Sequence, residues 1–161
     1  MKLWTSLVAT LLIASVCQAS DVDKTGADTF IRQVVQSLVD DQHIIAFEVA
    51  DKVFAIDNGE VLSKADLAKA WPSIGKQAFK TKVSVGQFFR DVTVQVYSPL
   101  ENKRLMSNKR VLQVYKPEPN DLYCDASHVK NGVDNFIGYD KAFIFIIRKV
   151  QGKWTLVGMG G

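Results

Sequence analysis

The chain has 161 residues, of which 47% are hydrophobic and 23% are charged, with 10 glycines and 4 prolines. This length and composition are typical of one globular domain with a packed core, and they exclude collagen-like, coiled-coil and low-complexity proteins. The formal net charge of +3 is too balanced for a nucleic-acid-binding protein, which would carry a strongly basic surface.

The first residues have the features of a secretory signal peptide. Lys2 precedes the uncharged run 3–16, and Cys17 and Ala19 occupy the small-residue positions of a cleavage site that follows Ala19. The run is shorter than the roughly 20 apolar residues of a membrane-spanning helix. An uncleaved anchor and a lipidated Cys17 are the alternatives, the second disfavoured by the bulky Val16. We expect export to the periplasm of a Gram-negative bacterium or secretion, with no stable membrane insertion after cleavage.

The domain organisation follows from this signal. We expect a signal peptide over residues 1–19, a flexible lead-in over 20–27 and one domain over 28–161. Cleavage leaves a single cysteine, Cys124, which could be buried, paired between chains or reactive. Burial is the interpretation we favour for this thiol.

The first part of the domain has helical periodicity. From Asp28 the apolar residues follow one helical stripe: Phe30, Ile31, Val34, Val35, Leu38 and Val39. A second helical piece is expected from Ile44 to a turn at Asn58-Gly59. Ser63 with Asp66 forms a capping box that opens a further helix through Trp71.

After residue 80 the apolar period changes to two, which predicts strands. Val92, Val94 and Val96 mark one strand after a bulge near Gly86, and a return strand is expected over 105–115. Residues 121–135 look irregular. Two further strands over 141–150 and 153–159 are joined at Gln151-Gly152 as a hairpin. Helices followed by an antiparallel sheet indicate a single α+β domain.

This order of elements resembles the nuclear transport factor 2-like superfamily, including its polyketide-cyclase-like and ketosteroid-isomerase-like members. The resemblance is carried by residues 56–61 leading into 63–71, and by 143–148 with 152–157. It implies N-terminal helices in the concave face of a curved, cone-like antiparallel sheet around an apolar pocket, and often a homodimer through the outer sheet face. The superfamily contains enzymes and non-catalytic proteins, so the fold does not decide the function.

Few residues are candidates for catalysis. Tyr123, Cys124, Asp125 and His128 form the densest polar cluster, in which a Cys–His pair could act as a nucleophile, although coincidence in a loop explains it better. The spacing is a poor zinc pattern, and no metal or cofactor is predicted. Asp57 is a further candidate at the mouth of a pocket, although turn chemistry also explains it.

Two other groups have a structural explanation beside the functional one. His43 follows two aspartates and could titrate near neutral pH, but a capping role is favoured. The candidates for an apolar ligand pocket, each of which ordinary packing could also explain, are Tyr97, Tyr115, Phe143, Phe145 and Trp154.

We therefore predict a non-catalytic exported binding protein. Its partner is either a small apolar molecule in the cone or a protein docked on the sheet, the latter including a toxin-immunity or inhibitor role. The alternative is a pocket enzyme of the isomerase, dehydratase or cyclase type that uses acid–base residues. The sequence contains no P-loop, Rossmann glycine series, nucleophile elbow or zinc-protease motif.

The signal peptide makes a prediction about mass. The protein recovered from its host should lack residues 1–19 and begin at Ser20, because signal peptidase cleaves after the small residue Ala19. Intact-mass spectrometry measures this directly. Recovery of the full 161-residue chain, or of a lipid-modified Cys17, would contradict the prediction.

Overall fold

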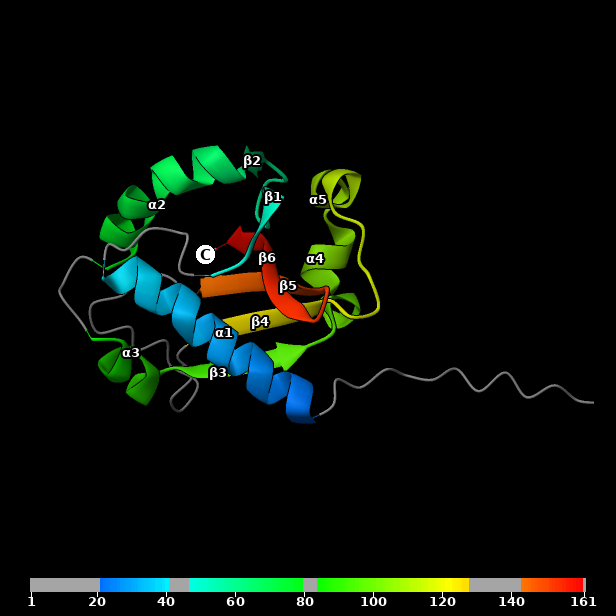
Figure 1. Cartoon of the computed structure of the whole chain (residues 1–161). Helices are drawn as coiled ribbons and strands as arrows, with labels where there is room; N and C mark the ends of the chain where they lie inside the picture. The colour runs from blue at the N-terminus through cyan, green and yellow to red at the C-terminus, as the bar shows by residue number, and fades with distance from the viewer. Residues whose placement is uncertain (1–20, 41–46, 80–83, 128–142, 161) are drawn as a thin grey trace, which may run out of the picture.

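The computed structural model describes residues 21–40, 47–79, 84–127 and 143–160, which form helices on both faces of one sheet (Figure 1). The elements are, in chain order, α1 (Asp21–Val39), β1 (Val49–Ala55), β2 (Val61–Ser63), α2 (Lys64–Ala78), α3 (Val85–Asp91), β3 (Thr93–Tyr97), the 3-10 turn η2 (Pro99–Glu101), α4 (Lys103–Ser107), α5 (Lys109–Val114), β4 (Leu122–Ser127), β5 (Phe143–Val150) and β6 (Lys153–Gly160).

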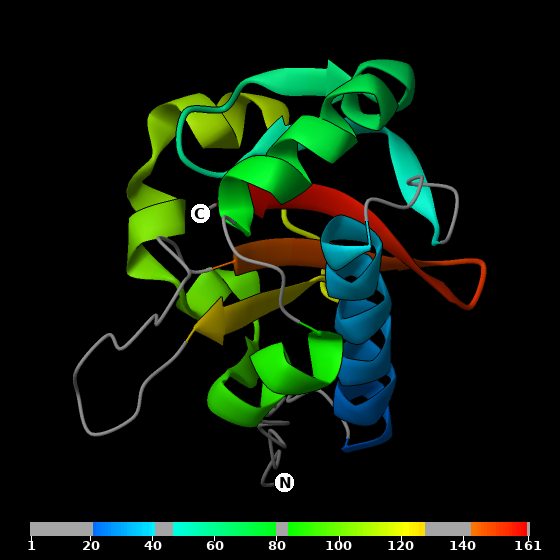
Figure 2. The ribbon, with the colours of Figure 1, turned by 90° about the vertical axis from the view of Figure 1, so that its left-hand side faces the viewer.

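The strands form one six-stranded sheet in the order β2-β1-β6-β5-β4-β3. Neighbouring strands are antiparallel except for β1 and β6, which are parallel. Helix α1 crosses the concave face, while α4 and α5 lie on the other side (Figures 1 and 2). The predicted α+β domain with helices in the concave face of a curved sheet is confirmed, with the difference that the sheet is mixed.

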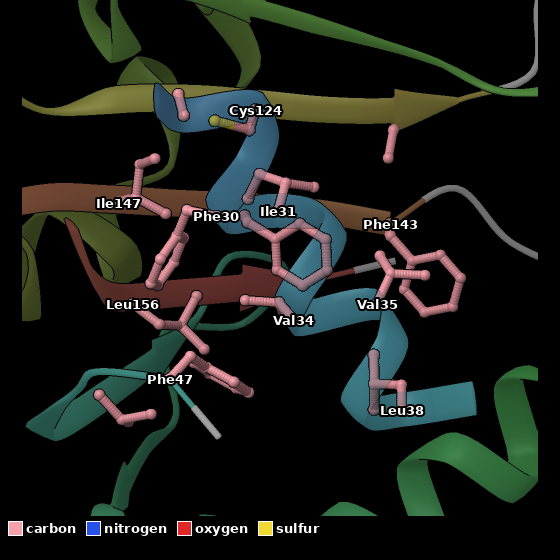
Figure 3. Close-up of a cluster of buried hydrophobic side chains, with 14 of the residues drawn as sticks. Phe30, Ile31, Val34, Val35, Leu38, Phe47, Cys124, Phe143, Ile147 and Leu156 are labelled. Atoms are coloured by element: carbon pink, nitrogen blue, oxygen red, sulfur yellow. The ribbon is translucent and has the colours of Figure 1, made fainter. Parts of the chain in front are cut away.

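The inner core lies between α1 and the sheet. Figure 3 shows the stripe of α1 over side chains of β4, β5 and β6. The predicted stripe is confirmed, because five of its members are at most 6% exposed: Phe30, Ile31, Val34, Val35 and Leu38. Burial of such a stripe contributes roughly 1.5–3 kcal/mol for each large side chain, which explains why α1 forms and where it packs.

Two close contacts hold α1 against α2. The indole Nε1 of Trp71 donates a hydrogen bond of 3.0 Å to Ser37 Oγ, and both residues are buried. At Gly75 a side chain would collide with the carbonyl oxygen of Leu38, so glycine permits the two helices to approach closely. The capping box is confirmed, since Ser63 accepts from the backbone N–H of Asp66 and opens α2.

The outer core is covered by α4 and α5, where a return strand over 105–115 was expected, and that prediction is wrong. Asn102 and Asn108 accept hydrogen bonds at the starts of the two helices, so each asparagine caps one short helix. The buried side chains of this core are Phe54, Ile56, Leu105, Val111, Tyr115, Tyr123, Ile146 and Val157.

Other predicted elements also differ from the structure. Helix α1 begins at Asp21, so residues 21–27 of the expected lead-in are helical. The expected second helix contains β1, whose Val53 and Phe54 are buried on opposite faces of the sheet and so disguise the strand alternation. Val85 opens α3 where a bulged strand was expected, and residues 122–127 form β4 where irregular chain was expected.

A buried carboxylate holds the end of the outer cover to the sheet. Asp121, 1% exposed, accepts hydrogen bonds from Tyr115 Oη at 2.7 Å and from the backbone N–H of Glu118 at 2.9 Å. Two further hydrogen bonds come from Arg148 on β5, whose Nε and Nη2 donate to the carboxylate oxygens at 2.7 and 2.9 Å. These hydrogen bonds satisfy the buried charge and connect the chain after α5 to a central strand.

Removal of this carboxylate should destabilise the fold. We expect Asp121→Ala to lower the free energy of unfolding by about 3–5 kcal/mol, because Arg148 and Tyr115 lose their common partner. Glu118→Ala is the matched control, because this acid also pairs with Arg148 but its side chain is 55% exposed. Its loss should cost at most about 1 kcal/mol. Urea unfolding measures both values, and equal effects would contradict this role of Asp121.

Candidate functional site

An open cleft among the described residues lies between α1 and the ends of β6, β1 and α2. Its volume is about 460 Å³, within the usual range of about 300–1,000 Å³ for small-molecule pockets. Its lining comes from four segments far apart in the sequence: Gly26, Thr29, Phe30, Gln33, Phe47, Glu48, Lys64, Lys153 and Trp154. We call this hollow the Trp154 cleft.

Aromatic side chains form the apolar part of the Trp154 cleft. The rings of Phe30 and Phe47 meet edge to face, with centroids 5.9 Å apart, and Phe47 packs in turn on Trp71. Phe30 and Phe47 belong to the inner core, and Trp154 packs against it. The apolar part is therefore supported by packed side chains, which makes it a preformed surface.

The position of Trp154 depends on the small residue opposite it on α1. A Cβ built at Gly26 would lie 3.0 Å from Trp154 Nε1, so glycine allows the indole to lie against the helix. On the strand side, Lys149 Nζ lies 5.2 Å from the centroid of the Trp154 ring and pairs with Asp23 of α1 at 2.8 Å. These contacts hold the indole at the edge of the cleft.

Polar side chains lie around the rest of the Trp154 cleft. Lys153 Nζ lies 3.6 Å from Glu48 Oε1, an exposed pair that contributes little to stability. Lys64 is the first residue of α2, and Thr29 and Gln33 are exposed residues of α1. The cleft thus combines an aromatic wall with groups that can contact a polar part of a ligand.

The sheet separates the predicted pocket residues into two groups. Phe143 and Phe145 lie in the inner core, where they stack on each other with centroids 6.2 Å apart. Tyr97 and Tyr115 pack in the outer core, on the opposite face. Of the five predicted pocket residues, Trp154 lines the cleft.

Both outer-face tyrosines have their hydroxyl groups engaged. Tyr97 stacks on Tyr123 at 4.9 Å and accepts a hydrogen bond of 3.1 Å from Asn102 Nδ2. Burial raises the pKa of Tyr97, and the hydrogen bond from Asn102 opposes that effect. Burial, together with the hydrogen bond to Asp121, raises the pKa of Tyr115 far above its usual value. Both phenols are therefore neutral near physiological pH and are poor proton acceptors.

The predicted acid–base residues lie outside the Trp154 cleft as far as they are described. Asp57 is exposed in the turn after β1, with Oδ1 3.8 Å from Arg104 Nη2. It also borders a small outer-face cavity of about 40 Å³. Asp125 lies on β4, and its Oδ1 is buried without a hydrogen-bond partner among the described residues. His128 and His43 lie outside the described residues.

Strand alternation divides the cluster around Cys124. Cys124 is fully buried in the inner core beneath α1, as the sequence predicted, while Tyr123 lies on the outer face. Asp125, two residues after Tyr123 on the same strand, shares that outer face. Burial, and to a smaller extent the charge of Asp28, raises the pKa of the Cys124 thiol well above its usual value. The thiol is thus a packed group of the inner core, on the opposite face of the sheet from Asp125.

The described ranges contain neither a metal-ligand cluster nor a membrane-spanning helix. Over residues 21–40, 47–79, 84–127 and 143–160, no three His, Cys, Asp or Glu side chains are placed to hold a metal ion. Within the same ranges, no helix has both the length and the apolar character needed to cross a membrane.

The sequence did not identify most of the Trp154 cleft. Phe30 was predicted as core, and Phe47, Lys64 and Lys153 gave no functional signal, because each is ordinary in its own segment. The glycine at position 26, one helical turn before Phe30, was the available signal, because a glycine inside a helix indicates a close neighbour.

Comparisons with known proteins concern the fold alone. No protein-family model matches the chain, and no curated protein sequence matches it. A solved structure titled Rd1NTF2_05, with five substitutions in its title, is similar over 87% of this chain and 98% of its own, at 14% identity and a TM-score of 0.44. Independently of that likeness, the curved sheet wrapped around helices in this chain agrees with the architecture that the sequence resemblance implies. The described part of the chain is thus an α+β domain with an open cleft beside α1.

The burial of Cys124 makes a prediction about reactivity. In the folded protein, iodoacetamide at mildly alkaline pH should leave Cys124 unmodified, because the thiol is inaccessible and its pKa is raised. After unfolding in guanidinium chloride the same thiol should react completely. Mass spectrometry reports the alkylated fraction, and rapid alkylation of the native protein would contradict the described packing.

Proposed function

We propose that this protein is an exported binding protein that holds a small ligand in the Trp154 cleft without changing it chemically. The observation that carries the proposal is the preformed aromatic wall of the cleft, made by Phe30, Phe47 and Trp154. Ligand pockets are typically hollows with apolar walls and a few polar groups that orient the ligand. Export rests on the signal-peptide features of residues 1–19.

The placement of the acid–base candidates favours binding over catalysis. A proton-transfer enzyme needs such groups within hydrogen-bond reach of the ligand. Tyr97 and Asp125 lie across the sheet from the Trp154 cleft, and Asp57 lies in an exposed turn beside α4. The cleft itself offers Glu48 and Lys153, which pair with each other at its edge.

A substitution that fills the cleft tests where a ligand binds. Gln33→Trp should weaken the binding of the apolar fluorophore N-phenylnaphthylamine by at least about tenfold, because the new indole occupies the space beside Trp154. Gln87→Trp, an identical change at an exposed residue of α3, should leave the affinity unchanged. Fluorescence titration of the mature protein measures both constants.

Two results would contradict the proposed function. One is the absence of saturable binding of N-phenylnaphthylamine to the mature protein, and the other is equal binding by the wild-type and Gln33→Trp proteins. Native mass spectrometry of the protein from its host adds a test of chemistry. A co-purified molecule should be recovered unchanged after incubation with fresh protein, whereas conversion to an isomer or a dehydrated product would support the enzyme alternative.

A further inference from the structure

The charges around the Trp154 cleft are unequal. Two lysines, Lys64 and Lys153, and one acid, Glu48, line it. Lys153 is paired with Glu48 at 3.6 Å, and the side chains of this pair are 74% and 55% exposed. One positive charge is therefore left over within the lining of the cleft.

Lys64 carries that remaining charge. The nearest acid along the helix, Asp66, bonds instead to Ser63 Oγ at 2.7 Å and to Lys69 Nζ at 3.3 Å. Among the residues that the structure describes, no carboxylate lies within ion-pair distance of the Lys64 ammonium group. An ammonium group beside an apolar wall attracts an anion more strongly than one in open water, because part of the surrounding solvent is replaced by protein.

We propose that the Trp154 cleft takes an amphiphilic organic anion, whose apolar body packs on Phe30, Phe47 and Trp154. Its carboxylate or sulfonate is held by Lys64, and Lys153 contributes when its pair with Glu48 opens. This inference rests on the proposed function, because it assigns a chemical class to the ligand of the same cleft. A neutral apolar ligand would fill the wall but leave the ammonium group of Lys64 unmatched.

Two probes with the same ring system show whether the cleft binds an apolar body alone or also prefers an anionic group. Anilinonaphthalene sulfonate and N-phenylnaphthylamine differ by the sulfonate group, so their affinities for the mature protein isolate the contribution of the anion. We expect the sulfonate to bind about fivefold more tightly at low salt, the gain expected from one partly exposed charge pair. That advantage should shrink in high salt, because added ions screen the attraction.

Four substitutions show which residues cause the higher affinity for the sulfonate probe. Lys64→Gln should remove about fivefold of the sulfonate affinity and leave the neutral probe unaffected. Lys153→Gln should have a smaller effect of the same sign. Glu48→Gln should strengthen sulfonate binding, because it frees Lys153 and removes a negative charge. Lys69→Gln, five residues further along α2 and paired with Asp66, is the matched control and should change the affinity for neither probe.

The outcomes distinguish this inference from the proposed function. Equal affinities for the two probes, with Lys64→Gln silent, would overturn the anion inference and leave the cleft as a binding site. Sulfonate binding that persists in Gln33→Trp would overturn the inference as well, because the anion would then bind elsewhere. If neither probe binds in a saturable manner, both the proposed binding function and the anion inference are contradicted.

Discussion

The apolar stripe of α1 is the constraint on which the rest of the structure depends. Its side chains fill the concave face of the sheet, so that Phe30, Ile31, Val34 and Val35 occupy the space that a cone-shaped fold could leave for a ligand (Figure 3). Well-packed interiors of this kind leave little free volume. The open space lies beside the stripe, in the Trp154 cleft, where Gly26 lacks a side chain and Trp154 lies against the helix.

The outer face of the sheet is also used by the chain itself. Helices α4 and α5 pack there on Phe54, Tyr123 and Ile146, and Asp121 joins the chain that follows them to Arg148 of β5. The resemblance to the nuclear transport factor 2-like superfamily implies dimers through this face, and in this chain α4 and α5 cover the outer core. The Trp154 cleft lies on the other side of the sheet, at the edge of the inner face.

Much of the fold could be predicted from the sequence, and the failures have physical causes. The stripe of α1, the capped start of α2 and the β5–β6 hairpin were predicted correctly because local periodicity and turn chemistry determine them. Strand β1 was missed because its neighbouring residues Val53 and Phe54 are buried on opposite faces of the sheet. Helices α4 and α5 were missed because they are too short to show a period. The candidate site was largely missed because the fold assembles it from distant segments, each unremarkable alone.

We propose that a ligand reaches only the edge of the inner core, beside Trp154. Residues 20–161 contain two tryptophans, the buried Trp71 and the half-buried Trp154, whose indole N–H groups give separate signals in a proton–nitrogen correlation spectrum. Titration with N-phenylnaphthylamine should shift the Trp154 signal and leave Trp71, which is bonded to Ser37, in place. A shift of the Trp71 signal with an unmoved Trp154 signal would contradict this placement of the ligand and indicate a ligand inside the core.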